Sequence, residues 1–361
     1  MEKFKSFITE AKEEPYKLLI LSHDDPFDPN ETGPMVRKKA SELGIEVYLA
    51  EFSGMYMEDK GKDQLVYSFP VDDDGKVELP GMKDDAEYDK PFRINPENTL
   101  VMARGIGSTV KTGNLSWRVA CLNLESQGYT LINPVICHDI CNDKWYNQIV
   151  FQQNDIRTPN TVLVRHSEGA EDAAERLGNK FPMILKTAVG SRGVGVIWIE
   201  SLKALHSVIQ LLHREDEFVD VLLQEYIKTD YDVRVIIAAG EILGAIKRPV
   251  VGDDFRSNVS QGSEPVSHEL TEREAQESLR AAESVQGQVV GVDFIPAKNR
   301  DKESPYFIEV NSTPGLMGIE AVLSKSAAKP LIKGKDRSIT KEILKMYMNR
   351  DNWTLDKSTE T

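Results

Sequence analysis

Two carboxylates and an amide near the C-terminal end have the types and spacing of ligands for a hard cation. In the strand-like stretch FIEVN, alternation predicts that Phe307, Glu309 and Asn311 share one face, and Asp293 lies within the apolar run VVGVDFIPA. A polar turn separates the two stretches, which predicts an antiparallel pair. Because Mg²⁺ prefers oxygen ligands, the pattern predicts a magnesium site. The alternative is a buried acid paired with a core lysine.

A lysine followed by a glycine-rich loop could bind phosphate. In MILKTAVGSRGVGVIWIE, a strand carrying Lys186 enters the loop GSRGVG, and a second strand leaves it. Glycines let backbone N–H groups approach phosphate oxygens, and the lysine adds a charge. The loop has neither Walker nor Rossmann spacing, and its strand–loop–strand form is typical of the flap over nucleotide phosphates in kinases. A simple glycine-rich turn is the alternative.

Charged residues also alternate in the stretch YDVRVIIAAGEILGAIKR, which predicts a hairpin. Asp232 and Arg234 share one face of the first strand, and Arg248 stands at the end of the second. Such charges on neighbouring strands commonly form a solvated sheet edge, and this alternative stays open. The polar segment DFRSN that follows reads by itself as a surface loop.

Strand-like runs alternate with helical patterns along most of the chain, which predicts an α/β fold. A βαβ unit over 17–50 opens an N-terminal domain, and a domain boundary is predicted near 130–142. Further helices are predicted over 113–127 and 143–155. These elements would bring the phosphate loop, the charged hairpin and the acidic strands into one region.

Composition excludes several classes of function. The chain has 44 Lys and Arg against 58 Asp and Glu, a net charge of −14, which argues against general binding of nucleic acid. The sequence has no run of ~18 apolar residues, so no membrane span is predicted. The charged N-terminus does not resemble a signal segment, so a cytoplasmic location is expected. The three cysteines do not suggest a disulfide framework, and Cys137-His138 with Cys141 would be a zinc half-site without a second half.

The order of these motifs resembles that of ATP-grasp ligases, and among them the RimK-type glutamate ligases. The resemblance rests on Lys144, Lys186 with its glycine loop, QEYI, Asp232-x-Arg234, AIKR, DFRSN, GVDF and EVNSTPGLMGIE. It implies an α/β (α+β ATP-grasp) fold. The expected parts are a Rossmann-like pre-ATP-grasp domain over 1–135, a small lid subdomain with the glycine-rich flap over 136–222, a large subdomain with the metal site over 223–350, and a tail over 351–361.

The resemblance also implies roles for individual residues. Those expected to bind ATP around its adenine and phosphates are Lys144, Lys186, Ser191, Arg192, Gly193, Val194, Gly195, Gln224, Glu225, Tyr226 and Ile227. Those expected at the ribose and the transferring phosphoryl group are Asp232, Arg248, Arg256, Ser257 and Asn258, of which the two arginines are catalytic. Asp293, Glu309 and Asn311 would hold two magnesium ions, for which manganese can substitute, with Glu309 as the bridge. Arg104, in ARGIGS, would help to hold a carboxylate substrate.

The family resemblance implies ATP-dependent ligation. A carboxylate attacks the γ-phosphate of ATP, and an amine converts the acyl phosphate to an amide. The expected substrates are an amino acid such as glutamate and a peptide or protein end, with neither nucleic acid nor membrane as partner. A dimer or tetramer is expected by analogy. A ligase for two small metabolites and a non-catalytic ATP-binding regulator stay open. Val189, where the family commonly has an acidic residue, and the insertion over 81–97 leave the acceptor in question.

Overall fold

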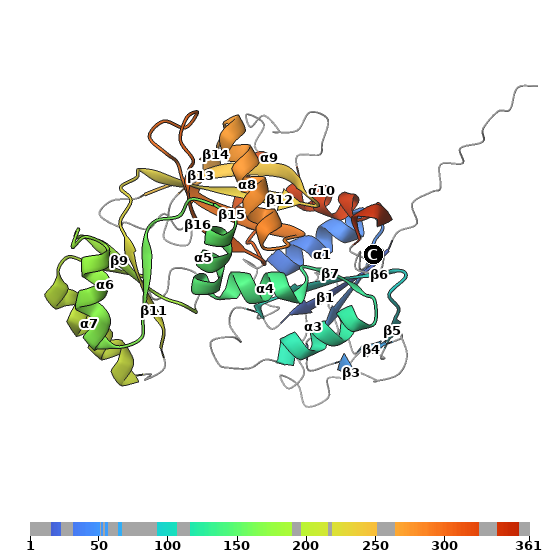
Figure 1. Cartoon of the computed structure of the whole chain (residues 1–361). Helices are drawn as coiled ribbons and strands as arrows, with labels where there is room; N and C mark the ends of the chain where they lie inside the picture. The colour runs from blue at the N-terminus through green and yellow to red at the C-terminus, as the bar shows by residue number, and fades with distance from the viewer. Residues whose placement is uncertain are drawn as a thin grey trace, which may run out of the picture.

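The structure is a computed structural model (Figure 1). It describes residues 16–22, 32–50, 52, 55–56, 64–66, 92–106, 116–189, 196–215, 219–250, 264–324 and 338–353. The described chain forms mixed helices and sheets, as the alternation of strand-like and helical patterns predicts. None of the helices in these ranges is long and apolar enough to cross a bilayer.

The N-terminal part contains a parallel sheet in the order β2-β1-β6-β7. Its strands are β1 (Lys17–Ser22), β2 (Glu46–Ala50), β6 (Thr99–Arg104) and β7 (Thr130–Ile132), and its helices are α1 (Thr32–Glu42) and α3 (Ser116–Ser126). The predicted βαβ unit is confirmed, because β1 and β2 pair in parallel with α1 between them. The unbroken apolar run in β1 suits a strand covered on both faces. Short strands β3 (Met55–Tyr56), β4 (Gln64–Val66) and β5 (Phe92–Ile94) form a separate antiparallel sheet.

A four-stranded antiparallel sheet in the order β10-β9-β11-β8 forms the smaller body in Figure 1. It comprises β8 (Thr161–Val164), β9 (Met183–Thr187), β10 (Val196–Ile199) and β11 (Val221–Glu225). The turn η2 (Ser167–Gly169) and the helices α6 (Ala170–Arg176) and α7 (Leu202–Glu215) cover one face. Met183, Leu185 and Leu223 pack into that core, so the alternation of side chains leaves Lys186 and Gln224 on the opposite face.

The largest sheet has the order β14-β13-β12-β15-β16. Its strands are β12 (Tyr231–Ala238), β13 (Glu241–Pro249), β14 (Val266–Ser267), β15 (Val289–Ile295) and β16 (Tyr306–Asn311). The predicted hairpin is confirmed, and Ala239 and Gly240 form its turn with positive φ angles of 45° and 76°. The predicted antiparallel pairing of the two acidic stretches is confirmed as β15 with β16.

Helices cover both faces of this large sheet (Figure 1). On one face lie α4 (Val135–Asn142), α5 (Lys144–Gln153) and α8 (Glu272–Ser284), which starts with a capping box formed by Thr271 and Glu274. On the other face lie α9 (Met317–Ser324), α10 (Ile339–Met346) and the N-terminal sheet; the turn η4 (Arg350–Asn352) follows. Along β12, Val235 packs toward the first group and Ile236 toward the second. The large sheet and the N-terminal sheet therefore share one hydrophobic core.

The predicted domain limits stay a prediction. The sheet order places β11, up to Glu225, in the small sheet, and α4 and α5 pack against the core of the large one. The predicted insertion over 81–97 and the predicted tail over 351–361 lie mostly outside the described residues.

A buried asparagine connects the N-terminal sheet to the large sheet. Asn133, which follows β7, donates from Nδ2 to the carbonyl oxygens of Val289 at 2.8 Å and Ser312 at 2.5 Å. Its Oδ1 accepts from the backbone N–H groups of Gln288 at 2.6 Å and Val289 at 2.7 Å. Asn133 therefore fixes the start of β15 and the end of β16 to the N-terminal part.

Replacing Asn133 tests this connection. Asn133→Ala removes four hydrogen bonds and leaves buried backbone groups without partners, so we expect the free energy of unfolding to fall by about 2–4 kcal/mol. Urea denaturation measures the change, with Asn299→Ala in an exposed turn as the control. Equal stability of the two variants would contradict a structural role for Asn133.

Candidate active site

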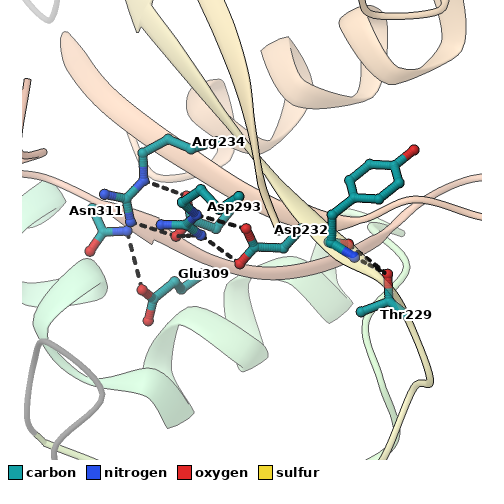
Figure 2. Close-up of polar contacts among 8 residues, drawn as sticks. Thr229, Asp232, Arg234, Asp293, Glu309 and Asn311 are labelled. Carbon is teal, nitrogen blue, oxygen red and sulfur yellow. Dashed lines mark hydrogen bonds and ion pairs between the residues drawn. The ribbon is translucent and has the colours of Figure 1, made fainter. Parts of the chain in front are cut away.

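A row of charged side chains crosses four neighbouring strands of the large sheet, β13, β12, β15 and β16. Arg248 on β13 lies opposite Asp232 on β12, Arg234 on β12 lies opposite Asp293 on β15, and Asp293 lies opposite Glu309 on β16. Opposed residues of an antiparallel pair project to the same face, as do residues two apart along one strand. The five side chains therefore share one face of the sheet, and Figure 2 labels four of them, Asp232, Arg234, Asp293 and Glu309.

Asp293 is the centre of this row. Arg234 donates to it in bidentate fashion, from Nε to Oδ1 at 2.7 Å and from Nη2 to Oδ2 at 2.6 Å (Figure 2). Arg248 donates from Nη2 to Asp293 Oδ2 at 3.0 Å and holds Asp232 through bonds of 2.7 and 2.6 Å. The partners of Asp293 are thus two arginines, and no lysine of the described chain forms an ion pair with it.

The burial of these side chains shows that they do not form a solvated sheet edge. Arg248 is 4% exposed and Asp293 is 3% exposed, and their strands are internal to the sheet, so the solvated-edge interpretation is wrong. Burial alone would raise the pKa of Asp293, but the charges and hydrogen bonds of Arg234 and Arg248 outweigh it and hold this pKa below its usual value. Burial likewise opposes the charge on Arg248, yet Asp293 and Asp232 raise its pKa.

A β-bulge corrects one expectation about the acidic strand. The register between β15 and β16 shifts so that Glu309 lies opposite Asp293 while Phe307 lies opposite Phe294, which leaves Ile308 as the extra residue. Phe307 packs in the core beside α5, on the face opposite to Glu309. The prediction that Phe307 shares the face of Glu309 is therefore wrong, because the bulge reverses the alternation.

The residues of this face fit a magnesium ion. Asn311 donates from Nδ2 to Glu309 Oε1 at 3.2 Å, so the two predicted ligands lie together (Figure 2). A carboxylate offers about four acceptor positions, and the arginines use three of those on Asp293, which leaves one for a cation. Asp293, Glu309 and Asn311 supply oxygen donors alone, the set that suits Mg²⁺. Their role as metal ligands stays a prediction.

Two lysines lie within electrostatic reach of Glu309. Lys186, on the open face of the small sheet, donates from Nζ to Gln224 Oε1 at 2.8 Å, and Gln224 in turn donates to Thr161. Burial lowers the pKa of Lys186 to about 8; the charge of Glu309 raises it and that of Lys144 lowers it further. Burial also lowers the pKa of Lys144, against the opposing charge of Glu309. The small sheet, through Lys186, and the start of α5, through Lys144, thus each place a cation within electrostatic reach of the acidic strand.

The start of α5 supports the base of the glycine-rich loop. Asp143 caps α5 by accepting from the N–H groups of Trp145 and Tyr146, and it forms an isolated bridge with Val189. The N–H of Lys144 donates to the carbonyl of Ala188 at 2.9 Å. The strand end that enters the loop is therefore attached to the same helix that carries Lys144.

Several predicted site residues lie outside the described residues: Ser191, Arg192, Gly193, Val194, Gly195, Arg256, Ser257 and Asn258. Their roles stay predictions. Arg104, the last residue of β6, is described and buried, and it lines a small cavity with Ser312 and Pro314, directly after Asn311 in the chain. The structure thus brings Arg104 close to the acidic strand.

The predicted adenine-binding segment continues from β11. Glu225 accepts from the N–H of Asn160 at 2.8 Å, and Tyr226 and Ile227 follow in the connection to β12, half-buried. The ring of Tyr226 meets that of Trp198 edge-on, with centroids 4.7 Å apart. Trp198 lies opposite Ile184, in the same row as Gln224, and sequence reasoning missed it. Its signal was the alternation of Val196 and Trp198 after the glycine loop.

The cysteines form no zinc site within the described chain. Cys137 and Cys141 lie one turn apart on α4, with their sulfur atoms 4.0 Å from each other. His138 directs its Nδ1 to Ser312 Oγ at 2.8 Å. No three His, Cys, Asp or Glu side chains of the described ranges are grouped to hold a metal. The predicted magnesium set is of a different kind, because its third member, Asn311, is an amide, and it stays a prediction.

Comparison with known families identifies this arrangement. The RimK-like ATP-grasp domain matches residues 141–334, more than half of the chain, and these residues include β15, β16 and both lysines. The chain belongs to this family. The RimK-like resemblance and the ATP-grasp fold inferred from the motifs are both confirmed.

Curated relatives of this RimK-like chain are named as glutamate ligases. It is 33% identical over 192 residues to a probable alpha-L-glutamate ligase of Rhodopirellula baltica, which covers 53% of the chain but only 46% of that protein. It is 30% identical over 225 residues to the ribosomal protein bS6–L-glutamate ligase of Escherichia fergusonii, covering 62% of the chain and 73% of the relative. The chain therefore spans less than half the length of the first relative.

Solved ATP-grasp structures superpose over most of the RimK-like chain. The ligase PsnB, complexed with a phosphomimetic variant of its minimal precursor, Mg and ADP, gives a TM-score of 0.61 at 16% identity and covers 94% of this chain and 100% of that one. D-cycloserine synthetase DcsG gives a TM-score of 0.59 at 13% identity, and the match covers 83% of this chain and 94% of that one. At these identities the likeness establishes the fold alone.

The lowered pKa of Lys186 predicts a pH dependence of nucleotide binding. Lys186 loses its proton as the pH rises through about 8, so we expect the affinity for ADP without metal to fall between pH 7 and pH 9. Calorimetric titration at several pH values measures this. Lys186→Arg is the control, because its guanidinium stays charged and the fall around pH 8 disappears. The same pH profile in both proteins would contradict the assignment.

Proposed function

We propose that this chain is an ATP-dependent carboxylate–amine ligase that joins glutamate, or a similar amino acid, to a peptide or protein end. The observation that carries the proposal is the placement of Asp293, Glu309 and Asn311 on one sheet face, within electrostatic reach of Lys186 on the small sheet and Lys144 at the start of α5. Oxygen donors and cations from two different bodies then converge on one site. Such a site suits a metal–nucleotide complex, because phosphates need both.

The proposed reaction has two steps. A substrate carboxylate oxygen attacks the γ-phosphorus of ATP and displaces ADP, which forms an acyl phosphate. An amine nitrogen then attacks the acyl carbon, loses a proton and releases phosphate, which leaves an amide. Phosphoryl transfer depends on positioning and on neutralising charge over the phosphoryl oxygens.

Named residues of the chain would divide this work. Asp293, Glu309 and Asn311 would hold magnesium, which supplies Lewis-acid stabilisation of the phosphates when bound. Lys186 and Lys144 would bind the phosphates, and Arg248 would neutralise the transferring group. The buried ion pairs of Arg248 with Asp232 and Asp293 orient its guanidinium before substrate arrives. Asp232 engages Arg248 in this structure, so any contact with the ribose would add to that ion pair.

The names of the relatives support the substrate class. A relative named for ribosomal protein bS6 and glutamate supports an amino acid and a protein end as substrates. The fold shared with PsnB is compatible with a peptide acceptor. The division into an N-terminal domain, a lid and a large subdomain, the cytoplasmic location and the homo-oligomer belong to the same proposal.

The experiment measures ADP release with Mg²⁺ and ATP while pooled amino acids and candidate peptides are screened. Mass spectrometry of the acceptor then separates a protein-end ligase from one that joins two small metabolites. ADP release at background with every acid and amine would contradict a ligase and favour a non-catalytic ATP-binding regulator.

Glu309→Gln tests the metal assignment within this function. Removing one charged ligand is expected to lower the rate of ADP release about 10²–10³-fold, since electrostatic stabilisation of the transferring group is lost. Glu303→Gln, in the exposed turn of the same β15–β16 hairpin, is the matched control and should keep full activity. A folded Glu309→Gln enzyme with more than half the control's activity would refute the assignment.

A further inference from the structure

Among the described residues, a set of four cations and four carboxylates interact by ion pairs or electrostatics before any ligand binds. Arg234, Arg248, Lys144 and Lys186 are linked by ion pairs or electrostatic interactions to Asp232, Asp293 and Glu309. Asp143, which caps α5 and interacts with Lys144, makes the number of described carboxylates equal to that of the cations. A free divalent cation therefore meets no net negative charge in this set, although three of its members have the ligands it prefers.

Arg234 has the most direct effect on the predicted metal ligands. It engages both oxygens of Asp293 and is itself 19% exposed, whereas Arg248 is 5% exposed and divided between two acids. Its side chain lies across β15 at Gly291, where a Cβ would come within 3.7 Å of Arg234 Cδ and 3.0 Å of Pro314 Cβ. Gly291 lies opposite Asn311, so the guanidinium reaches Asp293 beside the predicted ligands (Figure 2).

We propose that Arg234 makes the site select the metal–nucleotide complex over the free metal ion. This inference rests on the proposed function and adds a role for a residue outside the predicted binding set. The bidentate contact occupies two of the about four acceptor positions of Asp293 and places a positive charge beside the predicted metal ligands. A free cation is repelled by that charge, whereas the negative phosphates that accompany a bound metal are attracted by it. Metal and nucleotide then enter together.

The inference predicts that Arg234→Gln changes the affinity for free Mn²⁺ and the affinity for Mn²⁺–ADP in opposite directions. In Arg234→Gln the repelling charge is gone, so free Mn²⁺ should bind about tenfold more tightly, and the Mn²⁺–ADP complex about tenfold more weakly. Electron paramagnetic resonance of unbound Mn²⁺ measures the first affinity, and calorimetric titration of Mn²⁺–ADP measures the second. A purely structural role for Arg234 would weaken both.

Arg234→Lys separates charge from geometry and gives a second variant if Arg234→Gln does not fold. Lysine keeps the positive charge but cannot form the bidentate contact of the guanidinium. The ratio of the affinity for free Mn²⁺ to that for Mn²⁺–ADP should therefore stay within about threefold of the wild-type ratio. Arg273→Gln, on the exposed side of α8, is the control and should change neither affinity.

The outcomes are distinguishable from those that test the ligase itself. Wild-type protein that binds no Mn²⁺–ADP would contradict the proposed function. Wild-type binding with an unchanged affinity ratio in Arg234→Gln, weaker binding of free Mn²⁺ by that variant, or an Arg234→Lys ratio equal to that of Arg234→Gln would each overturn only the role of Arg234.

Discussion

The buried ion pairs around Asp293 are the interaction on which the rest of the site depends. Two arginines and two aspartates lie in register on β12, β13 and β15, in a sheet whose hydrophobic residues pack on both faces. Such pairs add little net stability, because desolvation offsets the attraction, but removing one partner costs about 3–5 kcal/mol. Their effect is geometric. Each charge holds its neighbour in one position before a ligand arrives.

The shared core explains how this geometry is kept. Because the N-terminal sheet packs on the same face from which Arg234 projects, the site lies where the N-terminal part meets the large sheet. Asn133 connects the backbone of both parts at the start of β15 and just after the end of β16. The acidic strand is thus fixed by neighbours distant in sequence. The small sheet contributes Lys186, and the chain just after β9 is attached to the start of α5 at Asp143 and Lys144.

Electrostatic balance connects the two bodies. Glu309 raises the pKa of Lys186 and of Lys144 although these residues lie on different elements, so the acidic strand partly offsets the burial of the lysines. A polyanion bound between them would be held by charges from both sides. The family match over residues 141–334 includes Glu309 and both lysines.

The sequence by itself predicted which groups carry chemistry, and it determined the order in which these groups occur along the chain. Alternation in YDVRV and the turn at Gly240 predicted the hairpin, and eight motifs in order indicated the RimK-like family, since local patterns report local structure. Only the tertiary structure decided which side chains contact one another. The bulge at Ile308 sends Phe307 into the core, because register depends on a strand that lies elsewhere in the chain. The pairing of Arg234 with Asp293, the placement of Trp198 beside Tyr226 and the low pKa of Lys186 likewise arise from contacts and burial between distant segments, which spacing along one strand does not encode.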